Sequence, residues 1–160
     1  MQLSTRFSIE QVTNSHDIIR IIHAAFERYK NDPMPSSALL ETAETVEKEQ
    51  QSGLKVFGIF DDGELFGVVK VTTYADYLYF ARLAVLPNQQ RKGIASALLL
   101  FLESYAKEQK LQRIECKVRK SETDNIRLYE NLGYKIVKEE LTQSPTGFIM
   151  GTVTMEKTIR

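Results

Sequence analysis

Apolar residues recur along the chain at two spacings, and each change of spacing marks the border of a predicted element. Alternating apolar and polar positions, rich in β-branched and aromatic residues, predict strands over Arg6–Val12, Leu54–Phe60, Leu65–Tyr74, Tyr77–Leu86, Arg113–Arg119, Tyr134–Leu141 and Ile149–Thr158. Apolar positions three or four residues apart predict four helices, which run from Asn14 or Ser15 to the stop at 31–35, from Ser36 or Ser37 to about Ser52, from Gly93 to about Gln109, and from about Glu122 to Leu132.

The order of these elements is strand, helix, helix, three strands, helix, strand, helix and two strands. It predicts an α/β (α+β) fold, in which a mixed, mostly antiparallel central sheet of about seven strands is flanked by four helices.

Several local signals refine this prediction. The run 61–64, Asp-Asp-Gly-Glu, predicts a tight hairpin between two strands, and Gly133 predicts a left-handed end to the last helix, which Ser121 or Thr123 caps at its start. In the second helix we expect the apolar side chains to face inward and the acidic ones outward. The first set is Leu39, Leu40, Ala43 and Val46, and the second is Glu41, Glu44, Glu47 and Glu49.

The composition predicts one globular domain over residues 1–160, since 42% of the residues are hydrophobic and 26% are charged. The single Cys116 cannot form an internal disulfide, and with two His it cannot supply the usual four ligands of a zinc cluster. We therefore expect no metal site and a small, buried, hydrophobic role for Cys116.

No apolar run approaches the roughly 20 residues that span a bilayer, and the first residues lack the apolar core of a secretory signal. We expect a soluble, cytoplasmic protein without membrane contacts.

The charge distribution separates the two halves of the chain. The totals balance, with 21 basic and 21 acidic side chains, which argues against a nucleic-acid partner. Residues 1–80 hold 7 basic and 12 acidic side chains, whereas residues 81–160 hold 14 and 9. This asymmetry predicts an anionic ligand on the second half and a cationic one on the first, with chance placement on solvated faces as the alternative.

A phosphate-binding pattern follows the strand that ends before Pro87. A helix that starts near Gly93 points unbonded N–H groups out of its positive end. Gly93 and Ala95 remove bulk where a phosphate would touch the backbone, and Arg91 and Lys92 add positive charge. The segment has neither the Gly-Lys-Ser/Thr ending of nucleoside triphosphatases nor the triple-glycine run of dinucleotide domains. It predicts a phosphate or pyrophosphate site of another kind.

The pattern Gln90-x-x-Gly93-x-Ala95, with Leu-x-Val-x-Pro ahead of it, resembles the acetyl-coenzyme A loop of the GNAT superfamily of N-acetyltransferases. The stretch Asn125–Tyr134 resembles the later helix of that family, with its Leu-Tyr-Glu-x-Leu-Gly-Phe/Tyr ending. The order of elements is also similar over nearly the whole chain. The resemblance therefore implies the acyl-CoA N-acyltransferase (GNAT-like) fold.

The resemblance also implies acetyl-coenzyme A as cosubstrate and names the residues that bind it. The main chain of three strand residues pairs with the pantetheine arm, and the N–H of Val85 polarises the thioester carbonyl. Main-chain N–H groups of the loop hold the pyrophosphate. The implied cofactor residues are Leu83, Ala84, Val85, Gln90, Arg91, Lys92, Gly93, Ile94, Ala95 and Ser96, together with Asn125 and Tyr129.

Tyr129 matches the family tyrosine that protonates the departing thiolate, with core packing as its alternative role. Many members carry an Asn seven residues before this tyrosine, but Glu122 stands there in this chain. Asn125 lies four residues before Tyr129 on the same helix face, so we expect it to replace the missing contact. The general base is not identifiable, and Glu27, Asp76 or a water chain remain open.

The resemblance implies an enzyme, an N-acetyltransferase that moves acetyl to a primary amine by direct attack in a ternary complex. The acceptor is a small-molecule or peptide amine, such as a polyamine, an aminoglycoside-like amine, or the lysine or N-terminus of a peptide, and segments 29–37 and 142–148 wall its site. An acyl group larger than acetyl remains open. Two alternatives are a non-catalytic acyl-CoA sensor or partner-binding module and an unrelated nucleotide-binding α/β domain. A homodimer also remains open, because sheet-edge dimers occur in the family.

Overall fold

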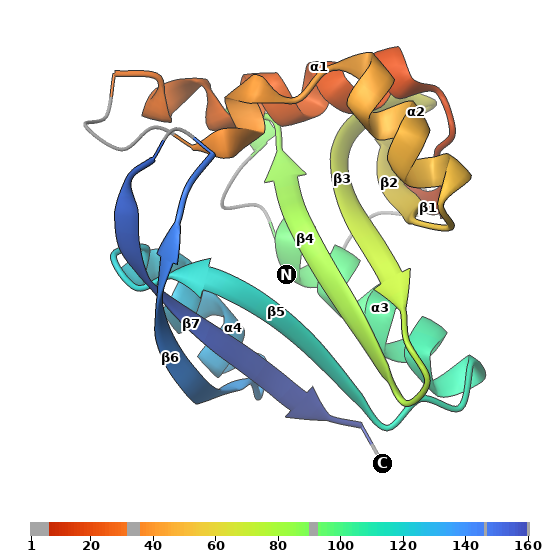
Figure 1. The fold of residues 1–160 in the computed structure, drawn as a ribbon. Coiled ribbons are helices and arrows are strands. Elements are labelled where there is room, and N and C mark those ends of the chain that lie inside the picture. The colour runs from red at the N-terminus through yellow and green to blue at the C-terminus, as the bar shows by residue number, and fades with distance from the viewer. Residues whose placement is uncertain (1–6, 32–35, 90–92, 146, 160) are drawn as a thin grey trace. The chain divides into compact units, whose positions relative to one another are not determined.

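The computed structural model describes residues 7–31, 36–89, 93–145 and 147–159. Seven strands, four α-helices and three short 3-10 turns follow one another in these residues (Figure 1). In chain order they are β1 Phe7–Gln11, α1 Ser15–Phe26, η1 Glu27–Tyr29, η2 Ser37–Leu40, α2 Ala43–Gln51, β2 Lys55–Asp61, β3 Glu64–Thr73, β4 Tyr77–Val85, η3 Pro87–Gln89, α3 Ile94–Glu108, β5 Arg113–Arg119, α4 Thr123–Asn131, β6 Lys135–Gln143 and β7 Ile149–Thr158.

The predicted strands are all present, with borders displaced by at most two residues, because turn residues mark their ends. Asp62 and Gly63 both have positive φ, 51° and 88°, as the two-residue hairpin between β2 and β3 requires. Asn14 caps α1 by accepting a hydrogen bond from the N–H of Asp17 at 3.0 Å. The predicted caps of α4 are wrong, since Glu122 occupies the cap position without a capping side-chain hydrogen bond.

The second predicted helix is interrupted. The 3-10 turn η2 ends at Leu40, and α2 begins at Ala43 after an extended Glu41 with ψ 148°. The interruption moves the side chains of Leu40 and Glu41 away from the positions that a continuous helix would give them. Leu40 is 57% exposed and Glu41 only 8%, so the expected inward Leu40 and outward Glu41 are both wrong.

The strands form one sheet in the order β1-β2-β3-β4-β5-β7-β6. The β4–β5 pair is parallel, whereas β1–β2, β2–β3, β5–β7 and β6–β7 are antiparallel. The expected mixed, mostly antiparallel seven-stranded sheet with four α-helices is therefore confirmed.

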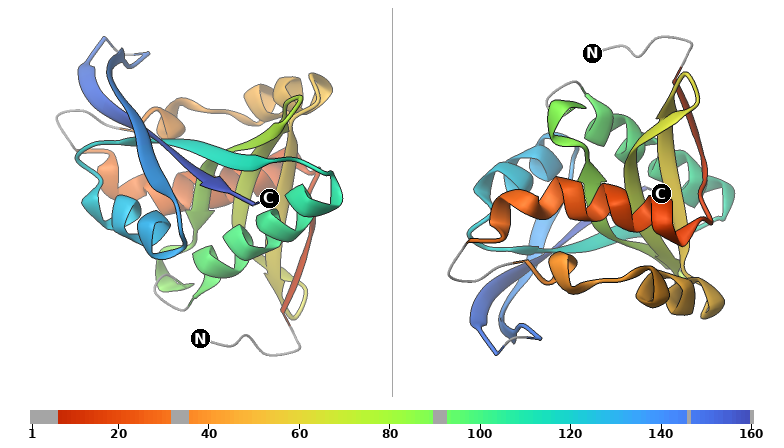
Figure 2. Two further views of the ribbon diagram at one scale, coloured as in Figure 1. Left: turned by 90° about the horizontal axis from the view of Figure 1, so that it is seen from below. Right: turned by 90° about the horizontal axis from the view of Figure 1, so that it is seen from above.

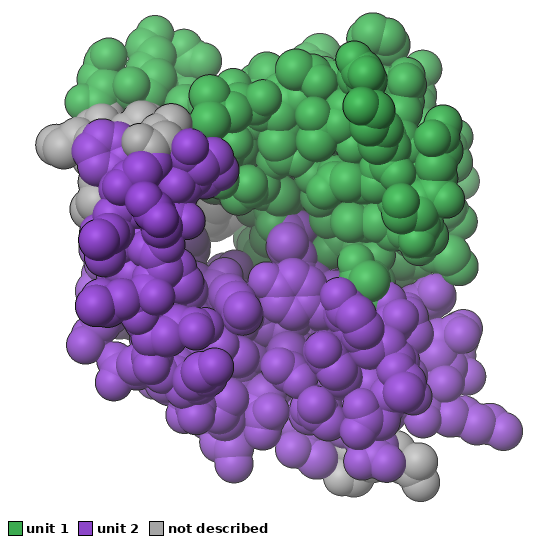
Figure 3. Space-filling view, in the orientation of Figure 1, with its two compact units in different colours: residues 1–72, 82–101 green, residues 73–81, 102–160 purple. Residues whose placement is uncertain are grey.

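The described residues group into two compact units, coloured separately in Figure 3. Unit 1 comprises residues 1–72 and 82–101, and unit 2 comprises residues 73–81 and 102–160. The expectation of a single domain over 1–160 stays a prediction.

Unit 1 is built around β2 and β3, whose middle residues are buried on both faces. Helices α1 and α2 lie side by side (Figure 2), and their apolar faces join Val56 and Val68 in one core. On the opposite face of β2, Phe57 meets Phe101 of α3 with ring centroids 5.0 Å apart. Both faces of these strands are thus covered, which explains their near-continuous apolar sequence.

Unit 2 holds β5, β6, β7 and α4 with the later part of α3 and the first part of β4. Its core includes Phe80, Cys116 and Met155, all at most 2% exposed. At one end Arg113 pairs with Asp76 at 3.2 Å and Glu115 at 2.9 Å, which joins the start of β5 to the turn before β4.

Candidate active site

The end of β4 leads directly into the predicted phosphate loop. Ala84 and Val85 are buried in β4, and the N–H of Leu86 donates to the carbonyl of Phe66 on β3 at 3.0 Å. The 3-10 turn Pro87–Gln89 follows. The predicted phosphate residues Gln90, Arg91 and Lys92 lie outside the described residues.

Gly93 stands at the boundary between this loop and α3. Its φ is +79°, a left-handed conformation that glycine adopts without steric cost. Its carbonyl accepts the first hydrogen bond of α3, from the N–H of Ala97 at 3.0 Å. The N–H groups of Ile94, Ala95 and Ser96 therefore lie in the first helical turn, where no acceptor exists within the helix. This end of α3 can bind an anion through its backbone.

Gly67 brings the end of β4 and the start of α3 to the same place on β3. A Cβ on Gly67 would lie 3.5 Å from the carbonyl oxygen of Ala84 and 3.5 Å from Cγ2 of Ile94. Both neighbours belong to the predicted cofactor residues, and all three positions lie in unit 1. The structure thus places two segments of the predicted site, 83–85 and 93–96, against one point of the sheet.

The pairing of β4 with β5 covers only its first three residues. The register runs from Tyr77 opposite Arg113 to Tyr79 opposite Glu115. Leu83, Ala84 and Val85 follow beyond these pairs, after Arg82, whose φ is +53°. The three residues predicted to pair with the pantetheine arm therefore lie in the part of β4, after Tyr79, that the β4–β5 ladder does not reach.

Tyr129 lies in the core of unit 2, 6% exposed, on the inner face of α4. Its ring meets Phe80 edge-on at 5.6 Å between centroids and lies 6.0 Å from the ring of Tyr134. Burial raises the pKa of Tyr129 above its usual value, and negative charge on Cys116 and Glu122 would raise it further. The phenol is therefore protonated at neutral pH and can donate a hydrogen bond.

Asn125 and Glu122 are both half-buried. Glu122 precedes the helix, and its carbonyl accepts from the N–H of Ile126 at 3.1 Å. Asn125 lies inside α4, one turn before Tyr129, as expected. Both belong to unit 2, together with Tyr129, whereas the segments 83–85 and 93–96 belong to unit 1.

The two side chains considered as general base are engaged with cations. Glu27 pairs with Lys30 at 2.9 Å and Asp76 with Arg113 at 3.2 Å. Cys116 is 2% exposed, and burial raises its pKa to about 12, so its thiol is protonated and unreactive at neutral pH. This agrees with the expectation that Cys116 is a small buried hydrophobe.

A buried charge cluster in unit 1 escaped the sequence analysis. Lys70, on β3, is 3% exposed and pairs with Glu41 and with Glu49, the latter at 2.6 Å. Arg82, on β4, donates to the second oxygen of Glu41 at 2.5 Å. One signal could have found it, because Lys70 interrupts the apolar run of β3 and a buried lysine requires an acidic partner.

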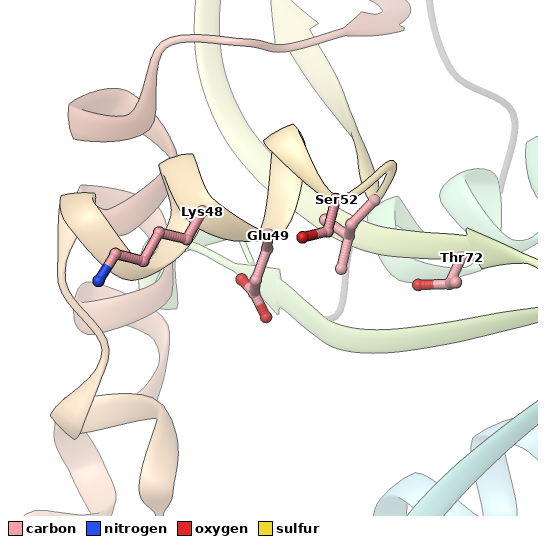
Figure 4. Close-up of a pocket in the computed structure, with 5 residues that line it drawn as sticks. Lys48, Glu49, Ser52 and Thr72 are labelled. Carbon is pink, nitrogen blue, oxygen red and sulfur yellow. The ribbon is translucent and has the colours of Figure 1, made fainter.

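An open pocket of about 350 Å³ lies at the C-terminal end of α2 (Figure 4). It is lined by Lys48, Glu49, Ser52, Leu54 and Thr72. None of the predicted site residues that the structure describes lines it.

Neither a metal-ligand cluster nor a membrane-spanning helix is found in the described residues. These residues contain no group of three or more His, Cys, Asp or Glu side chains placed to hold a metal ion. None of the helices that the structure describes has the length and apolar character needed to cross a membrane.

Comparison with known proteins gives one family and one fold. The profile of the acetyltransferase (GNAT) family matches residues 16–134. UPF0157 protein YqkA of Bacillus subtilis (strain 168) is 30% identical over 107 residues, which is 67% of this chain but only 30% of that protein's length.

Similar solved structures include the ribosomal-protein-S18-alanine N-acetyltransferase from Escherichia coli, with a TM-score of 0.78 and 20% identity over 96% of this chain and 94% of that chain. PaiA N-acetyltransferase from Thermoplasma acidophilum, in complex with coenzyme A, has a TM-score of 0.76 and 18% identity over 95% and 98%. The yncA acetyltransferase from Salmonella typhimurium, with its cofactor acetyl-CoA, has a TM-score of 0.70 and 15% identity over 98% and 95%. At such identities the likeness shows the fold alone, and it confirms the GNAT fold expected from the sequence.

Proposed function

This chain belongs to the acetyltransferase (GNAT) family, and from that membership we propose that it transfers the acetyl group of acetyl-coenzyme A to a primary amine. The observation that carries the proposal is the junction of β4 and α3. Gly93, with φ +79°, opens the positive end of a 15-residue helix, and Ala84 and Ile94 meet at Gly67. An anion-binding helix end beside a strand end suits a cofactor with a pyrophosphate and an extended amide arm.

The cofactor contacts follow from this junction. The first-turn N–H groups of α3 and the loop before it, Gln90 to Ser96, would hold the pyrophosphate. Main-chain groups of Leu83, Ala84 and Val85 would pair with the pantetheine arm as an added strand. Asn125 is proposed as a further contact from α4.

Acetyl-coenzyme A supplies a thioester whose carbonyl carbon an amine attacks and whose sulfur leaves as a thiolate. The N–H of Val85 would donate to the carbonyl oxygen as negative charge develops on it; such a donor contributes roughly 3 kcal/mol. Tyr129 would donate its phenolic proton toward the departing sulfur. The neutral amine attacks the thioester carbonyl directly, so no covalent enzyme intermediate is needed and orientation supplies much of the rate. The attacking nitrogen loses one proton to solvent, and Tyr129 regains from solvent the proton that it gives to the sulfur.

The acceptor is proposed only as a primary amine on a small molecule or a peptide. The acidic surplus of residues 1–80 suggested a cationic acceptor, but several of these carboxylates are paired within the fold. Glu41 and Glu49 pair with Lys70, and Glu44 pairs with Lys48. Charge alone therefore gives a weak basis for choosing among amines.

The test is a thermal unfolding assay of the purified protein with acetyl-coenzyme A, ATP and NAD in parallel. A ligand at about 100 times its Kd adds about 2.7 kcal/mol to the native state. A rise with acetyl-coenzyme A alone supports the proposal and is followed by an amine panel with detection of free thiol. Binding without thiol release from any amine would favour an acyl-CoA sensor. A larger rise with ATP or NAD would replace the proposal with a nucleotide-binding domain.

A further inference from the structure

Arg82 has an unusual backbone conformation for a residue inside a strand. Among the described residues other than glycine, Asp62, Arg82 and Lys110 have positive φ. Asp62 lies in the β2–β3 turn and Lys110 lies two residues past the end of α3, where left-handed residues are ordinary. Arg82, with φ +53°, lies inside the strand β4 instead. Such a conformation costs about 1–3 kcal/mol and persists only where the surroundings hold it.

The side chain of Arg82 makes two hydrogen bonds. Its Nε donates to Oε2 of Glu41 at 2.5 Å, and its Nη2 donates to Oγ of Ser37 at 2.8 Å. Both acceptors come from η2 and the residue that follows it. The side chain of Glu41 is 9% exposed and that of Arg82 29%, so water screens this charged bond little.

Glu41 is itself fixed from two other elements. Its other carboxylate oxygen, Oε1, accepts from Nζ of Lys70 on β3, and Lys70 also donates to Glu49 of α2 at 2.6 Å. Its carbonyl oxygen accepts from Nε2 of His23 on α1 at 2.7 Å. Figure 4 shows Glu49 on α2. Two cations and two carboxylates thus balance in the cluster, and breaking one pair would leave a buried charge uncompensated.

We propose that Glu41 is a positioning residue for acetyl transfer. Through its bond to Arg82, Glu41 holds the left-handed backbone conformation of that residue. This conformation sets the direction of the main chain of Leu83, Ala84 and Val85, which is to receive the pantetheine arm. The inference rests on the proposed function, because it assigns Glu41 to one part of that cofactor site. The anion-binding end of α3 does not depend on the cluster, because none of the residues 93–96 bonds to Glu41 or Arg82 in the described part of the chain.

The test uses titration calorimetry to compare binding of the whole cofactor with binding of its nucleotide part alone. The probes are acetyl-coenzyme A and adenosine 3′-phosphate 5′-diphosphate, which keeps the pyrophosphate and lacks the pantetheine arm. The variant Glu41→Gln keeps the shape and removes the charge that binds Arg82. We expect its Kd for acetyl-coenzyme A to rise about tenfold or more and its Kd for the nucleotide to stay within about twofold. Where the nucleotide binds too weakly for direct titration, its Kd is taken from competition with acetyl-coenzyme A.

Two further variants complete the experiment. Arg82→Ala removes the bond to Glu41, while its Cβ keeps the steric cost of the positive φ, so it should show the same split of Kd values while the fold is retained. Glu44→Gln is the matched control, since Glu44 lies on α2 with a side chain 75% exposed and pairs with Lys48. Neither Kd should change in it.

The outcomes divide clearly. If Glu41→Gln or Arg82→Ala changes both Kd values equally, or neither, while the wild type binds both probes, the positioning role is wrong and the cofactor site stands. If the wild type binds neither probe, the proposed function itself fails. Should Glu41→Gln not fold, the double variant Glu41→Gln with Lys70→Met restores the charge balance of the cluster, and the same split of Kd values is expected from it.

Discussion

The main-chain N–H of Tyr134 donates a 3.0 Å hydrogen bond to the carbonyl oxygen of Tyr129 and closes the last turn of α4. Gly133, with φ +99°, lies between them and makes this closure sterically free. The bond holds the two rings 6.0 Å apart, and each also contacts Phe80. Two buried phenols of different proposed roles thus lie next to each other, and phenylalanine substitutions distinguish them.

Tyr129→Phe removes the proposed proton donor and keeps the ring contacts with Phe80 and Tyr134. We expect kcat to fall about a hundredfold or more, within the usual range for a general acid, while Kd for acetyl-coenzyme A changes little. Steady-state kinetics and calorimetry on the same preparation measure both. An undiminished kcat would leave Tyr129 with core packing alone.

Tyr134→Phe should stabilise the protein. Within the described residues the buried hydroxyl of Tyr134 has no hydrogen-bond partner, and an unmade buried hydrogen bond costs about 1–3 kcal/mol. Removing the oxygen should raise the free energy of unfolding by about 1 kcal/mol, as measured by denaturant titration. A loss of stability of similar size would show that the hydroxyl is bonded in solution.

Gly93→Glu should abolish binding of acetyl-coenzyme A, because it places bulk and negative charge at the helix end that would hold the pyrophosphate. Gly93→Ala is the control for the backbone, since any side chain at φ +79° carries a cost of about 1–2 kcal/mol. We expect the alanine variant to lose stability but to retain measurable binding. Unchanged affinity in Gly93→Glu would remove the phosphate site from this helix end.

Cys116 should resist thiol reagents in the native state at pH 8 and react only as the protein unfolds, because it is 2% exposed. Burial raises its pKa to about 12 from the ordinary value near 9. The neutral thiol therefore contributes stability that is complete below about pH 9 and is lost as pH rises toward 12. Free energies of unfolding between pH 8 and 10.5 should fall less steeply in Cys116→Ala than in the wild type. Rapid labelling of the folded protein would contradict the burial.

Local sequence patterns were sufficient to predict most of the fold. The hairpin at 61–64 and the glycine end of α4 follow from residue types whose backbone preferences act within a few positions. The helix over 37–52 was mispredicted because its apolar spacing is continuous, whereas Glu41 is drawn inward by Lys70 and Arg82, which lie 29 and 41 residues away in sequence. No window of neighbouring residues contains that information.

The same division applies to the candidate site. The family, the strand–loop–helix segment around Gly93 and the place of Tyr129 on a helix could be predicted from contiguous motifs, because the residue types in these motifs have strong local backbone preferences. Three features became evident only from the fold: the β4–β5 pairs end at Tyr79, Arg82 adopts a left-handed conformation, and its side chain joins a buried ion cluster. Strand pairing and charge burial depend on partners that the fold brings together from distant positions, and burial turns an ordinary surface pair into a constraint on the backbone.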